Sequence, residues 1–230
     1  MKMKLAFIPV MAILSQLTVS AQAQTQIRAG LNLANISVTD NGRVDDANQL
    51  SSFHAGILAD LPLSGPVNLQ TGLLFTGKGS KVQHGTENTN GYFRQTFNPY
   101  YLEIPATVVV KTPGTNNRFF VGAGPYVAIG VGGKTKTEGQ NLLGLRYSSE
   151  RSIEFSNDDP STLNEEEDAG FGIVKRFDYG LNGTAGIEGK TIVLAVNYGL
   201  GLAKLQSGSN SGADNDNKHR VLGFTLGFKL

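Results

Sequence analysis

The stretch YYLEIPATVVV, residues 100–110, has the two-residue alternation of a β-strand, yet it contains a glutamate and a proline. Glu103, Pro105 and Thr107 share one face, and the opposite face carries only apolar or aromatic side chains. A buried carboxylate needs a partner, and a proline cannot donate a hydrogen bond to a neighbouring strand. The fold therefore depends on which of these two faces points toward the interior of the protein.

Segments with the same alternation recur along the chain. The last segment is the most regular, because Leu and Phe alternate with Gly, Thr and Lys from residue 222 to residue 230. The pattern predicts eight strands, at residues 25–37, 51–63, 66–77, 96–111, 118–132, 171–188, 190–204 and 219–230.

The connections between these strands alternate in length. Short turns follow the second, fourth and sixth strands, whereas the other connections have about 13 to 38 residues between the predicted ranges. An even number of antiparallel strands, with short turns at one end and long loops at the other, is typical of outer-membrane barrels. We therefore predict an all-β fold for residues 24–230, an eight-stranded antiparallel up-and-down transmembrane β-barrel whose four long loops are extracellular.

The polar faces of the predicted strands indicate which side points inward. They consist mostly of Gly, Ala, Asn, Gln and Thr, whereas a solvent-exposed sheet face is rich in Lys, Glu and Arg. Small and amide side chains suit the crowded lumen of an eight-stranded barrel. A membrane barrel is therefore favoured over a lipocalin-like soluble barrel, which is the alternative. Aromatic side chains expected near strand ends or on the outer face are Phe97, Tyr100, Phe119, Phe177, Tyr179, Phe224 and Phe228.

The few charged and amide side chains on the inward faces are expected to form a plugged polar network, because buried charges must be paired or hydrogen-bonded. Gln70 and Tyr126 are expected to flank Glu103. The predicted members of the network are Arg28, Gln70, Glu103, Tyr126, Arg176, Asp178, Glu188 and Lys229. The expected role of this network is structural, since eight strands leave no continuous wet channel.

Pro105 is expected to disturb its strand. A closed barrel has no free edge at which a missing N–H could face solvent. We therefore predict a β-bulge or a locally broken hydrogen-bond ladder at Pro105.

The first 23 residues have the features of a cleaved signal peptide. Lys2 and Lys4 precede an apolar segment, and Ala21 and Ala23 form a small-x-small cleavage site. Removing residues 1–23 leaves 18 basic and 19 acidic residues, a net charge of −1, which argues against a nucleic-acid partner. The chain contains no cysteine, so it has no disulfide bonds. These features predict export to the outer membrane of a Gram-negative bacterium.

Several of these segments together resemble a known family. The most specific are YLEIP, residues 101–105, and GAGPY, residues 122–126. The other segments, which follow the order of the family's successive strands, are IRAGLNLANIS, LLFTGKGSKV, FDYGLNGTAGIE, AVNYGLGLAKL and GFTLGFKL. Together they resemble the Bacteroidetes-type outer-membrane β-barrel proteins, called the "porin family" or PorT-like proteins. The resemblance implies an outer-membrane location and covers nearly the whole chain after the signal peptide. Strands of such barrels commonly end in an aromatic residue that the barrel-assembly machinery recognises. Here Phe228 stands two residues before the terminal Leu230, and the pair is predicted to serve as the assembly signal.

The remaining chemical motifs predict no catalytic residue, metal site or cofactor. AIGVGGKT, residues 128–135, lacks the first glycine of a phosphate-binding loop. His54 has Ser51 and Ser52 nearby, but no carboxylate is spaced to orient its ring. The acidic stretch at 156–170 lacks the ligand spacing of a calcium loop and is expected to be a solvated loop.

These observations predict a non-enzymatic outer-membrane scaffold with extracellular loops for surface interactions. The alternatives are a PorT-like component of a protein-secretion apparatus, a lipid-modifying enzyme with its site at the rim, and a narrow solute channel. The expected partners are outer-membrane lipids and lipopolysaccharide, the barrel-assembly machinery, and secretion or surface proteins.

Overall fold

The computed structural model describes residues 23–36, 49–87, 89–114, 116–141, 143–156, 173–205 and 217–230. Residues 1–22 lie outside these ranges, so the signal peptide and its cleavage site stay predictions. Most of the acidic stretch at 156–170 also lies outside them. No helix among the described residues is long and apolar enough to cross a membrane.

The secondary-structure elements of the described ranges are β-strands. In chain order they are β1 (Gln24–Ile36), β2 (Leu50–Ser64), β3 (Val67–Gly77), β4 (Ser80–His84), β5 (Phe93–Lys111), β6 (Arg118–Gln140), β7 (Arg146–Ser152), β8 (Glu154–Phe155), β9 (Ile173–Val174), β10 (Phe177–Glu188), β11 (Ile192–Gly201) and β12 (His219–Lys229).

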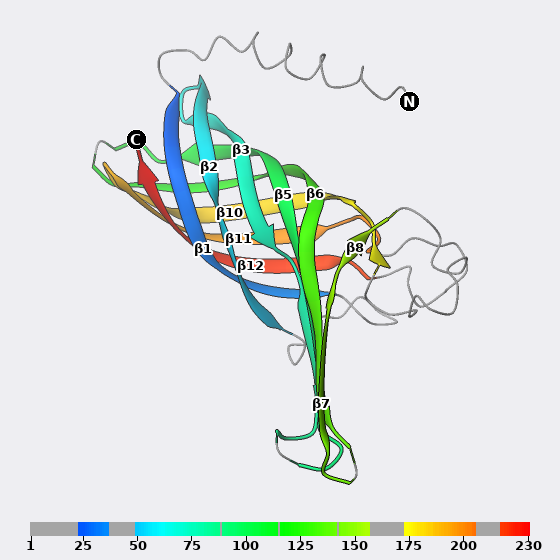
Figure 1. Ribbon diagram of the computed structural model, residues 1–230. Coiled ribbons are helices and arrows are strands. Elements are labelled where there is room, and N and C mark those ends of the chain that lie inside the picture. Colours follow the sequence, from blue (N-terminus) through cyan, green and yellow to red (C-terminus); the bar gives the residue numbers. More distant parts are fainter. Residues whose placement is uncertain are drawn as a thin grey trace, which may run out of the picture.

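Eight of these strands form a closed antiparallel ring in the order β1-β2-β3-β5-β6-β10-β11-β12 (Figure 1). β12 pairs back onto β1, with Gln26 opposite Lys229 and Ile36 opposite His219. The all-β, eight-stranded antiparallel barrel predicted from the alternation is confirmed.

The two faces of the ring differ in polarity, as the alternation of residues 100–110 predicts. Glu103 and Thr107 are 6% and 5% exposed, whereas Ile104 and Val108 are 50% and 45% exposed. The polar face of β5 therefore points into the lumen and its apolar face points outward, as it must in a barrel surrounded by lipid.

Two predicted loops contain strands, which corrects the expected boundaries. β5 and β6 continue past the ring, and β4 and β7 pair with their outer halves. We call this four-stranded sheet the extension; it comprises residues 80–84, 93–98, 133–140 and 146–152, and it projects away from the ring (Figure 1). The strand predicted at 171–188 begins only at Phe177.

An apolar cap lies at the end of the ring opposite the short turns. Its buried members are Ile36, Phe97, Ile153, Val174 and Leu205, and Phe155 packs against them. Phe97, expected near the outer surface, is only 2% exposed and belongs to this cap. The correction follows from strand parity, because Phe97 shares the inward face of β5 with Tyr101 and Glu103.

Pro105 coincides with a gap in the pairing of β5. The partners of β3 and β5 include Thr71 with Ala106 and Leu74 with Glu103, but no pair forms at Ile104 or Pro105 between them. The register is the same on both sides of the gap, so it contains no bulge. The register shift in β5 lies between Tyr100 and Tyr101, where it pairs with β6.

Close backbone contacts at glycine give a test of the packing between neighbouring strands. A Cβ added at Gly124 would clash with the Ala106 carbonyl oxygen and lie 2.7 Å from Thr107 Cα, whereas a Cβ at Gly183 would meet nothing within 4 Å. Gly124→Ala should therefore lower the free energy of unfolding by about 1–3 kcal/mol, and the control Gly183→Ala should change it by less than about 0.5 kcal/mol. Urea unfolding of the barrel in lipid vesicles measures both. Equal stability of the two variants would contradict the close packing at Gly124.

Candidate functional site

The end of the lumen near the short turns is closed by a group of charged side chains, which we call the turn-side cluster. Lys111 Nζ lies 2.6 Å from Asp60 Oδ2 and 2.9 Å from Glu188 Oε2. Arg118 Nη2 lies 2.5 Å from Glu188 Oε1, and Lys229 Nζ lies 3.2 Å from Glu188 Oε2. Three cations thus surround two carboxylates that are almost fully buried.

Amide side chains complete the hydrogen bonding of the turn-side cluster. Gln26 Nε2 and Gln70 Nε2 each donate to a different oxygen of Asp60, at 2.8 Å. Arg28 donates to Gln26 Oε1 from Nε and Nη2, at 3.1 and 2.9 Å. Both Asp60 oxygens are therefore satisfied, as a buried carboxylate requires.

A second group, the mouth-side cluster, lies nearer the apolar cap. Lys78 Nζ lies 2.7 Å from Glu103 Oε2 and 2.9 Å from Asp178 Oδ2. The Tyr126 hydroxyl donates to Asp178 at 3.1 Å, and Asn182 Nδ2 donates to Glu103 at 2.7 Å. The Lys78 ammonium also lies 3.8 Å from the centroid of the Tyr126 ring, a cation–π contact. Lys78 is thus enclosed by two carboxylates and an aromatic face.

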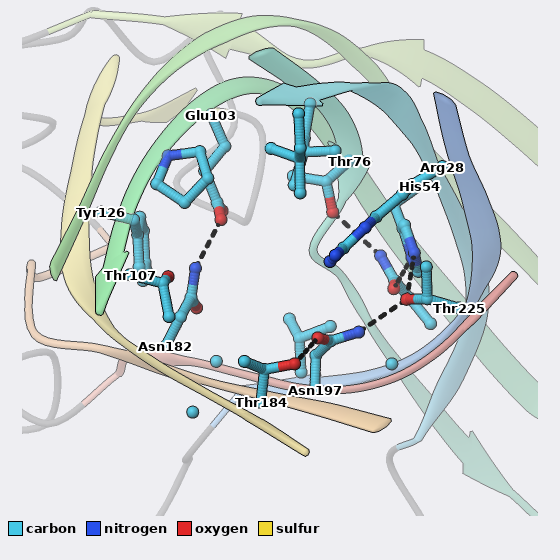
Figure 2. Close-up of a pocket in the computed structure, with 18 of the residues that line it drawn as sticks. Arg28, His54, Thr76, Glu103, Thr107, Tyr126, Asn182, Thr184, Asn197 and Thr225 are labelled. Atoms are coloured by element: carbon cyan, nitrogen blue, oxygen red, sulfur yellow. Dashed lines mark hydrogen bonds between the residues drawn. The ribbon is translucent and has the colours of Figure 1, made fainter. Parts of the chain in front are cut away.

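A cavity of about 90 Å³ lies along the lumen and is lined by neutral polar groups as well as members of the mouth-side cluster (Figure 2). His54 Nδ1 lies 2.7 Å from Asn32 Oδ1, and His54 Nε2 lies 2.9 Å from Thr225 Oγ1. Asn197 donates to the same hydroxyl, and Thr184 donates to Asn197. The volume suits a few water molecules rather than an organic ligand.

The structure divides the predicted lumen network between the two clusters. Arg28, Gln70, Glu188 and Lys229 lie in or beside the turn-side cluster, whereas Glu103, Tyr126 and Asp178 lie in the mouth-side cluster. Gln70 does not flank Glu103, because its amide binds Asp60 at the other end of the lumen. Phe228 and Leu230, the predicted assembly signal, both point outward and are 48% and 74% exposed.

The prediction for Arg176 is wrong. β10 begins one residue later, at Phe177, so Arg176 lies beyond the ring. Its side chain is exposed, and its guanidinium donates to the carbonyl oxygen of Phe155 at 3.2 Å. The sequence pattern places the start of this strand at residue 171, six residues before its observed start, and so assigns Arg176 to the inward face.

Sequence reasoning missed the two central cations of the lumen, Lys78 and Lys111. Both continue the inward parity of their strands, since Lys78 follows Thr76 in phase and Lys111 follows Thr107 in phase. Extending the parity to the strand ends would have found Lys111. Lys78 lies after the last residue of β3, so no strand pattern included it.

The histidines and the acidic residues provide no assembled catalytic or metal site within the described ranges. Both ring nitrogens of His54 are in hydrogen bonds, and Ser52 Oγ bonds to Asn98 instead. Among the described residues, no three His, Cys, Asp or Glu side chains are grouped to hold a metal ion. AIGVGGKT lies inside β6, in extended backbone rather than in a loop.

Exposed ion pairs lie on the extension. Lys134 donates a hydrogen bond to Glu150, which raises the pKa of the Lys134 ammonium and lowers the pKa of the Glu150 carboxyl group. Lys136 lies 2.6 Å from Glu138 Oε1, and their hydrogen bond lowers the pKa of Glu138. Exposed pairs of this kind contribute little to stability.

Residues 15–207 match the family described as outer membrane protein beta-barrel domain. The chain belongs to this family. Membership indicates an outer-membrane location and agrees with the closed ring and its apolar outer face. The narrower Bacteroidetes-type, PorT-like assignment stays a prediction.

Three solved structures of low sequence identity are similar to this chain. Ail, the attachment invasion locus protein of Yersinia pestis, is 13% identical, with 90% of this chain and 99% of that chain covered and a TM-score of 0.38. Neisserial surface protein A is 10% identical, with coverages of 90% and 96% and a TM-score of 0.43. The N-terminal β-barrel domain of Pseudomonas aeruginosa OprF is 10% identical, with coverages of 91% and 100% and a TM-score of 0.33. No curated protein matches the sequence.

Removing the central cation of the mouth-side cluster should destabilise the barrel. Lys78→Met leaves Glu103 and Asp178 buried without their ammonium partner, which should cost about 3–5 kcal/mol of unfolding free energy. The triple variant Lys78→Met, Glu103→Gln, Asp178→Asn should recover at least half of that loss, because it removes the unpaired charges as well. Urea unfolding in lipid vesicles measures both variants.

The exposed lysine of the extension serves as the control. Lys134→Met should change the same free energy by less than about 1 kcal/mol. A Lys78→Met barrel as stable as the unsubstituted protein would show that the mouth-side cluster does not depend on this ammonium.

Proposed function

We propose that this chain is a non-enzymatic scaffold of the Gram-negative outer membrane that holds its extension outside the cell for surface interactions. The observation that carries the proposal is the contrast between a lumen that holds a buried ion cluster near each end and two strands, β5 and β6, that continue beyond it into a four-stranded sheet. In barrels with short periplasmic turns, the opposite end is extracellular. The extension leaves the ring at that opposite end (Figure 1).

The lumen itself supports a scaffold more than a channel. The turn-side cluster, the mouth-side cluster and the apolar cap follow one another along the barrel, and the space between the clusters is about 90 Å³. An ion would have to displace buried, paired charges to pass. The position of His54 inside the lumen, with both ring nitrogens occupied, also gives no support to a lipid-modifying site at the rim.

The proposed partners follow from this location. A cleaved signal peptide at 1–23 would deliver the chain to the periplasm, and the barrel-assembly machinery would recognise the last strand with Phe228 and Leu230. Outer-membrane lipids would surround the apolar wall. A surface partner would meet the extension, whose strand β7 has every side chain exposed.

Cysteine labelling tests the orientation, and the natural absence of cysteine makes the experiment direct. Ser149→Cys on β7 should react with a membrane-impermeant maleimide in intact cells, because the extension lies outside. Thr191→Cys, in the turn between β10 and β11, should react only after the outer membrane is permeabilised. The reverse labelling pattern would refute the proposed orientation and with it the proposed function.

Electrical recording tests the closed lumen. The purified barrel in planar lipid bilayers should show no discrete conductance steps, because two buried ion clusters lie across the path through its lumen. A large general porin inserted in the same bilayers is the positive control. Reproducible steps from the folded barrel would favour the channel alternative over the scaffold.

A further inference from the structure

The extension has two faces that continue the two faces of the barrel wall. Residues paired directly across antiparallel strands point to the same side of a sheet. Tyr100, on the outward face of β5, is followed on that face by Asn98, Thr96 and Arg94. The side that continues the lipid-facing wall is called the outer face of the extension below.

The outer face of the extension is basic. Asn98 pairs with Lys134, Thr96 pairs with Lys136 and Lys81, and Arg94 pairs with Glu138. Together with β7, this face carries five cations, Lys81, Arg94, Lys134, Lys136 and Arg146. It carries two carboxylates, Glu138 and Glu150. The opposite face of the same described residues carries one arginine, Arg151, and no carboxylate.

The basic residues begin directly above an aromatic cluster of the outer wall. The ring centroids of Phe53, Phe75 and Tyr100 lie 5.2 to 6.0 Å apart. Aromatic side chains gather where the hydrocarbon of a membrane meets its headgroups. This cluster therefore marks the level of the outer interface beside β2, β3 and β5.

Strand geometry places the lysines within reach of the lipid headgroups. A strand rises about 3.3 Å per residue. Lys134 is two residues beyond Gly132, the partner of Tyr100, and Lys136 is four residues beyond it. Their backbones thus lie at most about 7 and 13 Å beyond the level of Tyr100, and long lysine side chains at such positions reach toward the membrane interface.

We propose that the outer face of the extension binds the phosphate groups of outer-leaflet lipids, with Lys81, Lys134 and Lys136 as the principal contacts. Long lysine side chains act as mobile point charges toward phosphate, and basic residues near a membrane attract anionic lipid. The pairs of Lys134 with Glu150 and of Lys136 with Glu138 are exposed, so a lipid phosphate can replace the carboxylate at small cost.

The continuity of the surface selects lipid over other polyanions. On β5 the outward face passes from the apolar wall through Tyr100 to Thr96 and Arg94. The register shift between Tyr100 and Tyr101 gives β6 one extra residue at this level and leaves Lys134 and Lys136 on the same side of the sheet as that face. A lipid whose acyl chains lie against the wall would carry its phosphates to these lysines in one binding mode. The proposal rests on the proposed function only for the orientation of the barrel in the outer membrane.

Native mass spectrometry of the full chain, folded in detergent micelles, tests the proposal. The probes are bisphosphorylated lipid A and the same lipid with both phosphates removed. The unsubstituted protein should bind the bisphosphorylated lipid at least tenfold more tightly than it binds the lipid without phosphates. The triple variant Lys81→Gln, Lys134→Gln, Lys136→Gln should lose at least tenfold of that affinity, because each cation near a lipid surface contributes appreciably to binding.

A charge-matched variant controls for the loss of three positive charges. Arg151→Gln, Lys190→Gln, Lys204→Gln removes cations from the opposite face, the turn between β10 and β11, and the segment after β11. It should bind within twofold of the unsubstituted protein. Unchanged affinity in the first triple variant, or equal binding of the two lipids, would overturn the proposal.

Two further outcomes distinguish a lipid site from a polysaccharide surface and from a barrel of the opposite orientation. A sulfated polysaccharide that binds more tightly than lipid A, with the same loss in the first triple variant, would overturn the assignment to lipid and identify a polysaccharide surface. If Ser149→Cys is labelled in intact cells but the first triple variant keeps its lipid affinity, the lipid site is refuted and the proposed orientation stands. Failure of that labelling would instead refute the proposed function.

Discussion

Charge pairing across a narrow lumen is the constraint on which this barrel depends. Eight strands enclose room for side chains, but too little room for the water that would hydrate separate charges. Lys78 therefore lies between Glu103 and Asp178, and Lys111 lies between Asp60 and Glu188. In each cluster the carboxylates come from strands that are not neighbours in the ring, since β5 and β10 hold one pair and β2 and β10 hold the other. The turn-side cluster thus joins opposite walls, and the mouth-side cluster joins two strands on either side of β6, which backbone hydrogen bonds between adjacent strands cannot do.

β5 and β6 pass through two environments, and the polarity of their two faces reverses between the ring and the extension. Below Tyr100 the outer side of β5 is apolar and the inner side is polar; above it the outer side becomes basic, and the inner side contributes Phe97 to the apolar cap. The register shift of the β5–β6 pair lies between Tyr100 and Tyr101, at the point of this reversal. An irregularity of this kind bends a strand and increases its twist, which suits a sheet that must leave the curvature of the ring.

Sequence patterns predicted the ring well because its alternation has a direct physical cause. Lipid on one side and a crowded lumen on the other impose a period of two along every spanning strand, and the segments around Glu103 and Leu222 display it clearly. The pattern weakens beyond the rim, where β6 and β7 carry polar or charged side chains on both faces, so the sequence predicts a loop at residues 133–152. The same weakness placed Arg176 in the lumen, because nothing in the sequence marks where the strand ends. Lys78 required the position of a side chain just past a strand end, which only the folded chain defines.

The pairing of β1 with β12 has a consequence for the order in which the protein can assemble. Gln26 pairs with Lys229, so the ring cannot close until the last residues of the chain are present, and joining segments so far apart in sequence costs more loop-closure entropy than pairing the two strands of a hairpin. The hairpin of β5 and β6 joins residues much nearer in sequence and is available early. The extension, which depends on that hairpin, can therefore exist in a precursor whose ring is still open. Such a precursor would have unpaired edges at β1 and β12, while the extension is already formed.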